Sequence, residues 1–188
     1  MRPLTLILTG VGLLLGCDSG ATDPEPTDLI RDEAAPVQTG SLLYILERDA
    51  VQGSNGWLRR LQTFIDYRYT NPTDQTIYIV KCHTVSFRLE KLGVTGEWVA
   101  VWAGRDYTRC LGEPTVVQSG AMLSGTLEVS GYEPNSQAWP QFAVPDMEGV
   151  FRLILLSAVY LEDASEYPDG IEVEREHLYS NHFELRVR

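Results

Sequence analysis

Apolar and polar side chains alternate along most of the chain after residue 41. Between residues 61 and 69, Leu61, Ile65 and Tyr67 fall on one face of an extended chain, while Gln62 and Asp66 fall on the other. A period of two is the pattern of a half-buried β-strand. This alternation, together with short apolar or β-branched runs, predicts eight or nine strands, at residues 42–46, 61–69, 76–80, 85–90, 97–102, 115–118, 123–129, 150–160 and 182–187.

Turn-forming residues separate these segments at near-regular spacing. The segment 71–74 contains a proline that fixes φ, flanked by Asn71 and Asp74, whose side chains can bond to the backbone. Residues 150–160 are almost all apolar, which predicts a central strand buried on both faces. No segment shows a sustained helical period. We therefore expect an all-β fold, an antiparallel β-sandwich of about seven to nine strands.

The first 40 residues follow a different pattern. A basic start, with Arg2, precedes an apolar run over residues 4–15 and then Gly16 and Cys17. The run is too short to cross a bilayer, which needs ~20 residues, so residues 1–16 are predicted to be a secretory signal peptide. Residues 17–40 are rich in Asp, Glu, Pro and Thr and lack apolar periodicity. They predict a disordered tether ahead of a folded domain at residues 41–188.

The end of the apolar run resembles the lipobox of bacterial lipoproteins, because Leu14, Leu15 and Gly16 stand directly before Cys17. The resemblance implies cleavage before Cys17 and attachment of acyl chains, palmitate among them, to that residue. It also implies that the folded domain lies outside the cytoplasm, held to a membrane of the bacterial cell envelope by the lipid on Cys17. The sequence leaves open whether this is the inner or the outer membrane.

Three segments of the chain resemble immunoglobulin-like envelope domains of bacterial lipoproteins. They are residues 69–79 around the Asn-Pro turn, residues 87–98 and residues 149–153. The resemblance runs from about residue 58 to 188 and implies an immunoglobulin-like β-sandwich with no assigned activity. Some similar domains are described as proteinase inhibitors. Phe151 stands where a tyrosine corner needs a hydroxyl group, so that hydrogen bond of antibody domains cannot form.

The chain has three cysteines, Cys17, Cys82 and Cys110. If Cys17 carries the lipid, one pair remains, and an exported protein meets an oxidising compartment. We therefore expect a structural disulfide between Cys82 and Cys110. A redox role is disfavoured because the pair lacks the C-x-x-C spacing that lowers a thiol pKa.

Charge and motifs narrow the classes of function. The chain has 15 basic and 26 acidic side chains, a net charge of −11, which disfavours direct binding to nucleic acids or anionic lipid headgroups. No P-loop, G-x-S-x-G, H-E-x-x-H or dinucleotide-binding glycine pattern occurs. We therefore expect a protein that is not an enzyme and that has no cofactor.

Two surfaces are candidates for binding. Trp139 lies in a long segment, residues 131–145, without a strand pattern, and Tyr132 is the second residue of that segment. Aromatic side chains of this kind are enriched at binding hot spots. The acidic segment 162–176 could supply oxygen ligands to calcium from Asp163, Glu166 and Asp169, but its spacing does not match an EF-hand loop. We therefore expect this segment to be a solvated loop and not a metal site.

The first functional hypothesis is therefore a lipid-anchored module that binds a protein partner in the cell envelope. Its contact surface would come from long loops or from a strand added to an exposed sheet edge. The alternatives are a proteinase inhibitor and a module that binds glycans or calcium through Trp139 or the acidic segment. The sequence names neither the partner nor the oligomeric state.

Overall fold

The computed structural model describes residues 32–188, apart from residues 54–55, 82–83, 105–112, 137 and 163–168. The described part is built almost wholly from strands, so the prediction of an all-β fold is confirmed. Its elements are β1 (Val37–Thr39), β2 (Leu43–Gly53), β3 (Gly56–Thr70), β4 (Ile77–Ile79), β5 (Phe87–Leu92), β6 (Trp98–Ala103), β7 (Thr115–Val117), β8 (Met122–Tyr132), β9 (Gly149–Leu155), β10 (Ala158–Tyr160), β11 (Ile171–Glu172), the 3-10 helix η2 (Arg175–His177) and β12 (Phe183–Val187).

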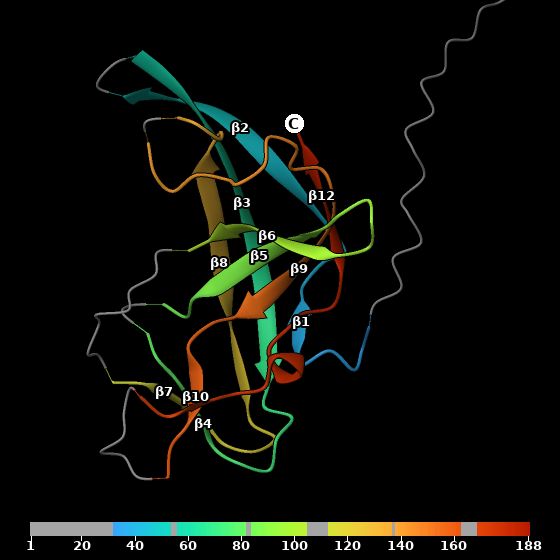
Figure 1. Cartoon of the computed structure of the whole chain (residues 1–188), viewed down its shortest axis with the longest axis vertical. Helices are drawn as coiled ribbons and strands as arrows, with labels where there is room; N and C mark the ends of the chain where they lie inside the picture. Colours follow the sequence, from blue (N-terminus) through green and yellow to red (C-terminus); the bar gives the residue numbers. More distant parts are fainter. Residues whose placement is uncertain (1–31, 54–55, 82–83, 105–112, 137, 163–168) are drawn as a thin grey trace, which may run out of the picture.

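Eight of these strands form one large sheet (Figure 1). Its order is β8, β3, β2, β12, β9, β5 and β6. The short strand β1 pairs with the same edge of β3 as β2 does, farther along β3. β12 pairs in parallel with β2, whereas the other described pairings in this sheet are antiparallel. The sheet is therefore mixed, and the prediction of a purely antiparallel arrangement is wrong at this pair. Alternation along a strand fixes which side chains face inward, but it does not fix the direction of the neighbouring strand.

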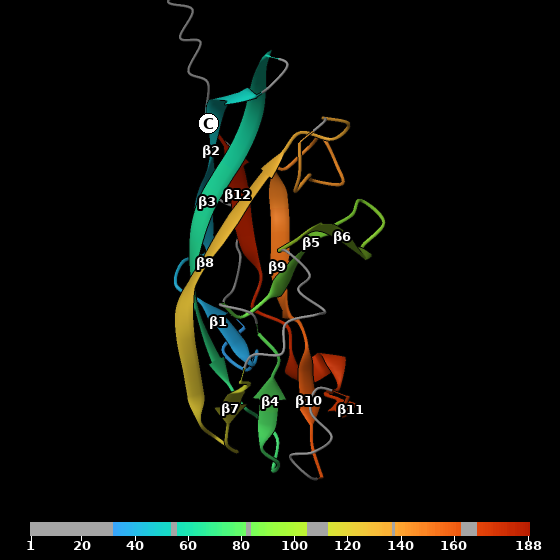
Figure 2. The same ribbon diagram turned by 90° about the vertical axis from the view of Figure 1, so that its left-hand side faces the viewer.

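A second, smaller sheet has the order β11, β10, β4 and β7, all paired antiparallel. It lies at the end of the molecule where β4, β7 and β10 are labelled in Figure 2. The segment 150–160 was expected to be one strand, but it divides between the two sheets as β9 and β10. The break falls at Ser157, whose φ of 59° lies in the left-handed region and interrupts the extended chain. The expectation of a central position holds for β9, which pairs with β5 and β12.

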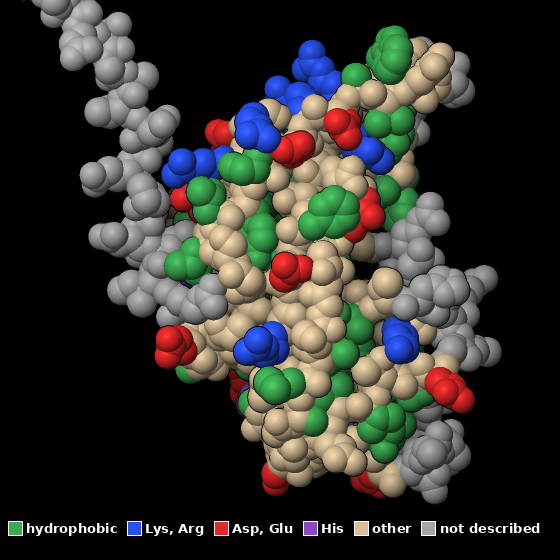
Figure 3. Space-filling view, turned by 180° about the vertical axis from the view of Figure 1, so that it is seen from behind, with side chains coloured by type: hydrophobic (Ala, Val, Ile, Leu, Met, Phe, Trp, Pro, Cys, Tyr) green, Lys and Arg blue, Asp and Glu red, His purple; other side chains and the backbone are tan. Residues whose placement is uncertain are grey.

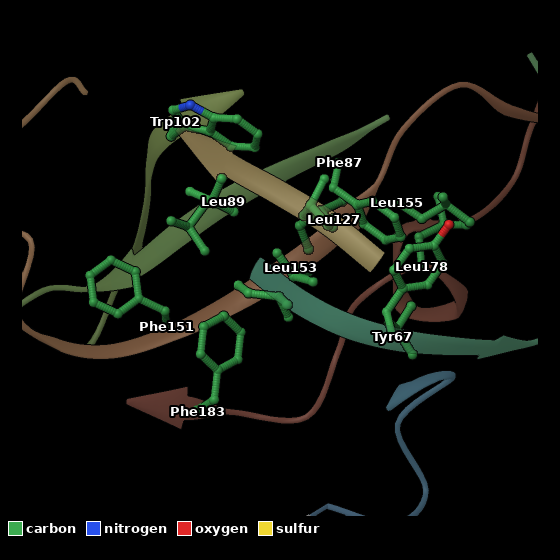
Figure 4. Close-up of a cluster of buried hydrophobic side chains, with 14 of the residues drawn as sticks. Tyr67, Phe87, Leu89, Trp102, Leu127, Phe151, Leu153, Leu155, Leu178 and Phe183 are labelled. Atoms are coloured by element: carbon green, nitrogen blue, oxygen red, sulfur yellow. The ribbon is translucent and has the colours of Figure 1, made fainter. Parts of the chain in front are cut away.

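The core lies between the two arms of the large sheet. Figure 2 shows β2, β3 and β8 on one side of the molecule and β5, β6 and β9 on the other. Side chains from both arms point into the same interior, among them Tyr67 from β3, Leu127 from β8, Leu89 from β5 and Leu153 from β9 (Figure 4). Along β3 the odd-numbered positions from 61 to 69 are buried, as the alternation predicts, and Phe64 is 57% exposed on the outer face.

The folded region begins before the predicted boundary at residue 41. β1 occupies residues that were assigned to the tether, and its Val37 and Thr39 are buried against the large sheet. Its burial depends on Asn181, whose backbone N–H donates to the Val37 carbonyl at 3.0 Å and whose side-chain Oδ1 accepts from the Thr39 N–H at 2.7 Å. A three-residue strand held by a partner 142 residues away leaves no periodic signal in the sequence.

The predicted turn at residues 71–74 is confirmed, and the buried side chain of Asn71 organises it. Its Oδ1 accepts hydrogen bonds from the backbone N–H and the hydroxyl of Thr73, at 3.0 and 2.9 Å. Its Nδ2 donates to the carbonyls of Gln75 and Val117, at 2.8 and 3.0 Å. Asn71 therefore ties the turn after β3 to β7 of the small sheet.

Tyr69 is fully buried, and its hydroxyl has no hydrogen-bond partner among the described residues. Burial raises the pKa of this hydroxyl far above its usual value. Because an unpartnered buried hydroxyl costs free energy, Tyr69→Phe is expected to leave the free energy of unfolding unchanged or to raise it by up to ~1 kcal/mol. Urea denaturation measures this change.

The matched control is Tyr44→Phe, because the Tyr44 hydroxyl accepts a hydrogen bond from the Ser41 N–H at 2.9 Å. That variant is expected to lose about 1 kcal/mol. A loss of more than 1 kcal/mol in Tyr69→Phe would contradict the assignment of an unsatisfied hydroxyl.

Candidate functional site

A groove of about 870 Å³ runs beside β8, between this strand and the β5 and β6 strands. One edge of β8 pairs with β3 over the whole of its length. Its other edge faces the groove, where no described strand pairs with it between residues 124 and 128. The floor is aromatic, with Tyr67, Phe87 and Trp102, and the rim is polar. The groove therefore combines a free strand edge with apolar side chains.

The hydrogen bonds at one end of β8 identify which of its backbone groups face the groove. Both the N–H and the carbonyl of Tyr132 bond to the segment 140–142, at 2.8 and 3.0 Å, and the Ser130 carbonyl accepts from the indole N–H of Trp102 at 2.9 Å. In an antiparallel strand, successive residues direct these groups to opposite edges. The register with β3 is unbroken from Met122 to Tyr132. The N–H and carbonyl groups of Ser124, Thr126 and Glu128 therefore also point to the groove.

The two aromatic candidates, Tyr132 and Trp139, do not line this groove, but each lies close in the chain to a residue that does, Ser130 and Pro140. The chain after β8 folds back, so that Gln141 forms an isolated parallel bridge with Tyr132. The Ala143 N–H donates to the Val101 carbonyl of β6 at 2.7 Å. The segment 140–143 thus connects the ends of β8 and β6. The peptide bond between Trp139 and Pro140 is cis.

Trp139 is 59% exposed, as expected for a binding residue. It lines a second, shallower hollow of about 340 Å³ together with Arg88 of β5 and residues 100–104. Tyr132 is half-buried by the returning segment and presents less surface. Seen from the side opposite to Figure 1, hydrophobic side chains are spread among polar and charged ones and do not form one broad patch (Figure 3).

The other sequence candidates receive less structural support. Asp169 is exposed, whereas Asp163 and Glu166 lie outside the described residues, as do Cys17, Cys82 and Cys110. In the part of the chain that the structure describes, no group of three or more His, Cys, Asp or Glu side chains could hold a metal ion. No helix among the described residues is long and apolar enough to cross a membrane.

A charged cluster on the outer face of β5 and β9 was not foreseen from the sequence. Glu90 is only 2% exposed and forms ion pairs with three arginines. Arg152 donates to its Oε2 from Nε and a terminal nitrogen, at 3.0 and 2.8 Å, while Arg88 and Arg175 approach its Oε1 at 3.0 and 2.5 Å. We call these four side chains the Glu90 cluster. The alternation Arg88, Glu90 on β5 predicts a solvated outer face, and only the strand order brings Arg152 and Arg175 to it.

Aromatic side chains frame the Glu90 cluster. The Arg152 guanidinium lies 4.4 Å from the ring centre of Trp98 and 5.4 Å from that of Tyr179. His182 packs against Trp98 with ring centres 4.8 Å apart. Burial, and secondly the charge of Arg152, lower the pKa of His182 below its usual value. His182 is therefore neutral at pH 7 and adds no charge to the cluster.

Comparison with known proteins assigns no family to this chain. No protein-family model matches it, and no curated protein matches it. Among solved structures, it is similar to the Pseudomonas fluorescens alkylpurine DNA glycosylase AlkC bound to DNA containing an abasic site analog, with 12% identity and a TM-score of 0.28. The match covers 81% of this chain and 31% of that chain. A likeness at this level supports neither a shared fold nor a shared activity.

Proposed function

We propose that this protein is a lipid-anchored, non-enzymatic module of the bacterial cell envelope that binds a protein partner. Its mature chain would begin at Cys17, its anchor would be the lipid on that residue, and its domain would be a variant of the immunoglobulin-like β-sandwich. The two facing arms of the large sheet and the all-β architecture support the proposed fold class. The observation that carries the binding function is the unpaired edge of β8 beside an aromatic groove.

Strand addition is the binding mode that fits this edge. A partner segment in extended conformation would bond to the backbone of Ser124, Thr126 and Glu128 and would continue the pairing that residues 140–142 make with Tyr132. Main-chain hydrogen bonds would supply affinity, and pockets for alternate side chains would supply specificity.

The groove also predicts the composition of the partner segment. Side chains that point inward would meet the partly exposed side chains of Val85, Leu123 and Pro140 and are expected to be apolar. Side chains that point outward would lie beside Thr126 and Glu128, on a protein with a net charge of −11. Complementary charge favours lysine or arginine at these positions. The expected ligand is therefore a strand that alternates apolar and basic or polar residues.

Thr126→Pro tests this proposal. The Thr126 N–H points to the groove, so proline removes an edge donor without removing a hydrogen bond to β3, and proline is tolerated at such edge positions. We would select peptides from a displayed random library on the domain of residues 28–188. The selected peptides are expected to alternate apolar and basic residues and to bind Thr126→Pro at least tenfold more weakly.

Thr126→Ala is the matched control, because it also loses the hydrogen bond from the Thr126 hydroxyl to Asp66 but keeps the backbone donor. It should bind the selected peptides as the wild type does. Leu127→Pro, which removes a bond of the β3 ladder, should unfold the domain. Equal affinity of the peptides for the wild type and for a folded Thr126→Pro would refute strand addition at β8.

A further inference from the structure

The Glu90 cluster contains three arginines but one carboxylate, so its positive charge exceeds its negative charge. Its three arginines each contribute one guanidinium cation. Glu90 supplies one negative charge, and no other acidic side chain among the described residues forms an ion pair with these arginines. Glu174, next to Arg175 in the chain, instead accepts from the Tyr160 hydroxyl at 3.0 Å. The four side chains of the cluster therefore carry a net charge of about +2 in an acidic protein.

The arginines are held in place and remain partly accessible. The side chain of Arg152 is 15% exposed and lies between Trp98 and Tyr179, whereas those of Arg88 and Arg175 are 33% and 55% exposed. Terminal nitrogens of Arg88 and Arg175 lie 3.0 and 2.5 Å from the same oxygen atom of Glu90, so their guanidinium groups lie side by side. Arg88 also lines the hollow that contains Trp139, which leaves its side of the cluster open to solution.

Two guanidinium groups fixed side by side form a ready binding site for an oxyanion. Guanidinium presents planar pairs of N–H donors that match the spacing of phosphate oxygens, and both groups here retain N–H donors beyond those that Glu90 accepts. Glu90 orients the two groups before any ligand arrives, which lowers the entropy lost on binding. The surplus charge matches a dianion. The acidic surroundings disfavour a long polyanion such as a nucleic acid.

We propose that the outer face of β5 and β9 binds a small dianionic oxyanion of the phosphate class at Arg88 and Arg175, with Glu90 as the internal counter-ion that positions both. This site is separate from the groove beside β8 and does not depend on the proposed partner. Its occupant would be inorganic phosphate or a phosphate monoester, whose organic part could extend toward Trp139 in the adjoining hollow.

Titration of the folded domain with inorganic phosphate and with phenyl phosphate, at constant ionic strength, tests the site. Calorimetry is expected to show saturable one-to-one binding of at least one of them. Tighter binding of phenyl phosphate would identify a phosphate monoester as the natural class, and equal binding would identify phosphate itself. NMR is expected to show a rise in the pKa of His182 with bound anion, because the anion offsets the nearby charge of Arg152 that lowers it.

Arg175→Gln is expected to weaken phosphate binding at least tenfold, since it removes one of the two charged donors. Arg175→Lys should restore only part of the affinity, because lysine keeps the charge but not the paired donors. Arg59→Gln, at an exposed arginine 3.9 Å from Glu133 and outside the cluster, is the control and should bind as the wild type. Non-saturable binding to the wild type, or equal affinity in Arg175→Gln and Arg59→Gln, would overturn the proposal.

Discussion

Glu90→Gln is expected to lower the free energy of unfolding by about 3–5 kcal/mol, the range for breaking a buried ion pair by removing one partner. The variant keeps the shape of the side chain and removes the carboxylate that the three arginines share. Arg152, mostly buried between two aromatic rings, would then keep an uncompensated charge. Arg88 and Arg175 would repel each other across the neutral amide.

Urea denaturation followed by tryptophan fluorescence measures this loss, and Glu47→Gln provides the matched control. Glu47 pairs with Arg188, and both side chains are more than half exposed. An exposed pair of this kind contributes ~0–1 kcal/mol, so the control should unfold close to the wild type. If the two glutamine variants lose the same small amount, Glu90 is not the electrostatic centre of the cluster.

Asn181→Ala is expected to cost about 2–4 kcal/mol and to release β1 from the sheet. The Asn181 side chain is fully buried and makes four hydrogen bonds, three of them with Thr39 and one with the His182 carbonyl. Alanine leaves the Thr39 N–H buried without an acceptor, and an unsatisfied buried donor costs ~1–3 kcal/mol by itself. Hydrogen exchange should accelerate in β1 more than in β3.

Thr39→Val distinguishes the hydrogen bonds that the Thr39 hydroxyl makes with Asn181 from the one that its backbone N–H makes. It removes the hydroxyl of Thr39 but keeps its backbone N–H bonded to Asn181, so a smaller loss of about 1 kcal/mol is expected. Faster exchange throughout β3 in Asn181→Ala, with no preference for β1, would show that Asn181 supports the whole sheet and not this strand.

The elements that the sequence could predict are those whose burial depends on their own periodicity. β3 and β8 alternate regularly, and both form at the expected place with the expected inward face. β1 escaped prediction because its burial depends on Asn181, and the split of β9 from β10 because it depends on the backbone conformation at Ser157. In each case the deciding interaction is a single residue and not a pattern.

The candidate sites also divide into those that the local sequence indicates and those that depend on strand order. Composition and loop length pointed to Trp139 and Tyr132; the structure places Trp139 in the second hollow and pairs Tyr132 with the segment that follows Trp139. The free edge of β8 and the Glu90 cluster depend on strand order. Glu90 and Arg152 face each other across β5 and β9, and Arg175 comes from a separate 3-10 helix. No local sequence pattern predicts that residues from these separate elements lie together.

The parallel pairing of β2 with β12 has a consequence for how the domain folds. β12 lies between β2 and β9, so residues 183–187 join the two arms of the large sheet, and they follow β2 by well over a hundred residues. An emerging chain that lacks them would leave β2 and β9 with open edges, which are templates for aggregation. Contacts of such long sequence separation also slow folding. The chain therefore exposes both edges until its last strand has paired with them.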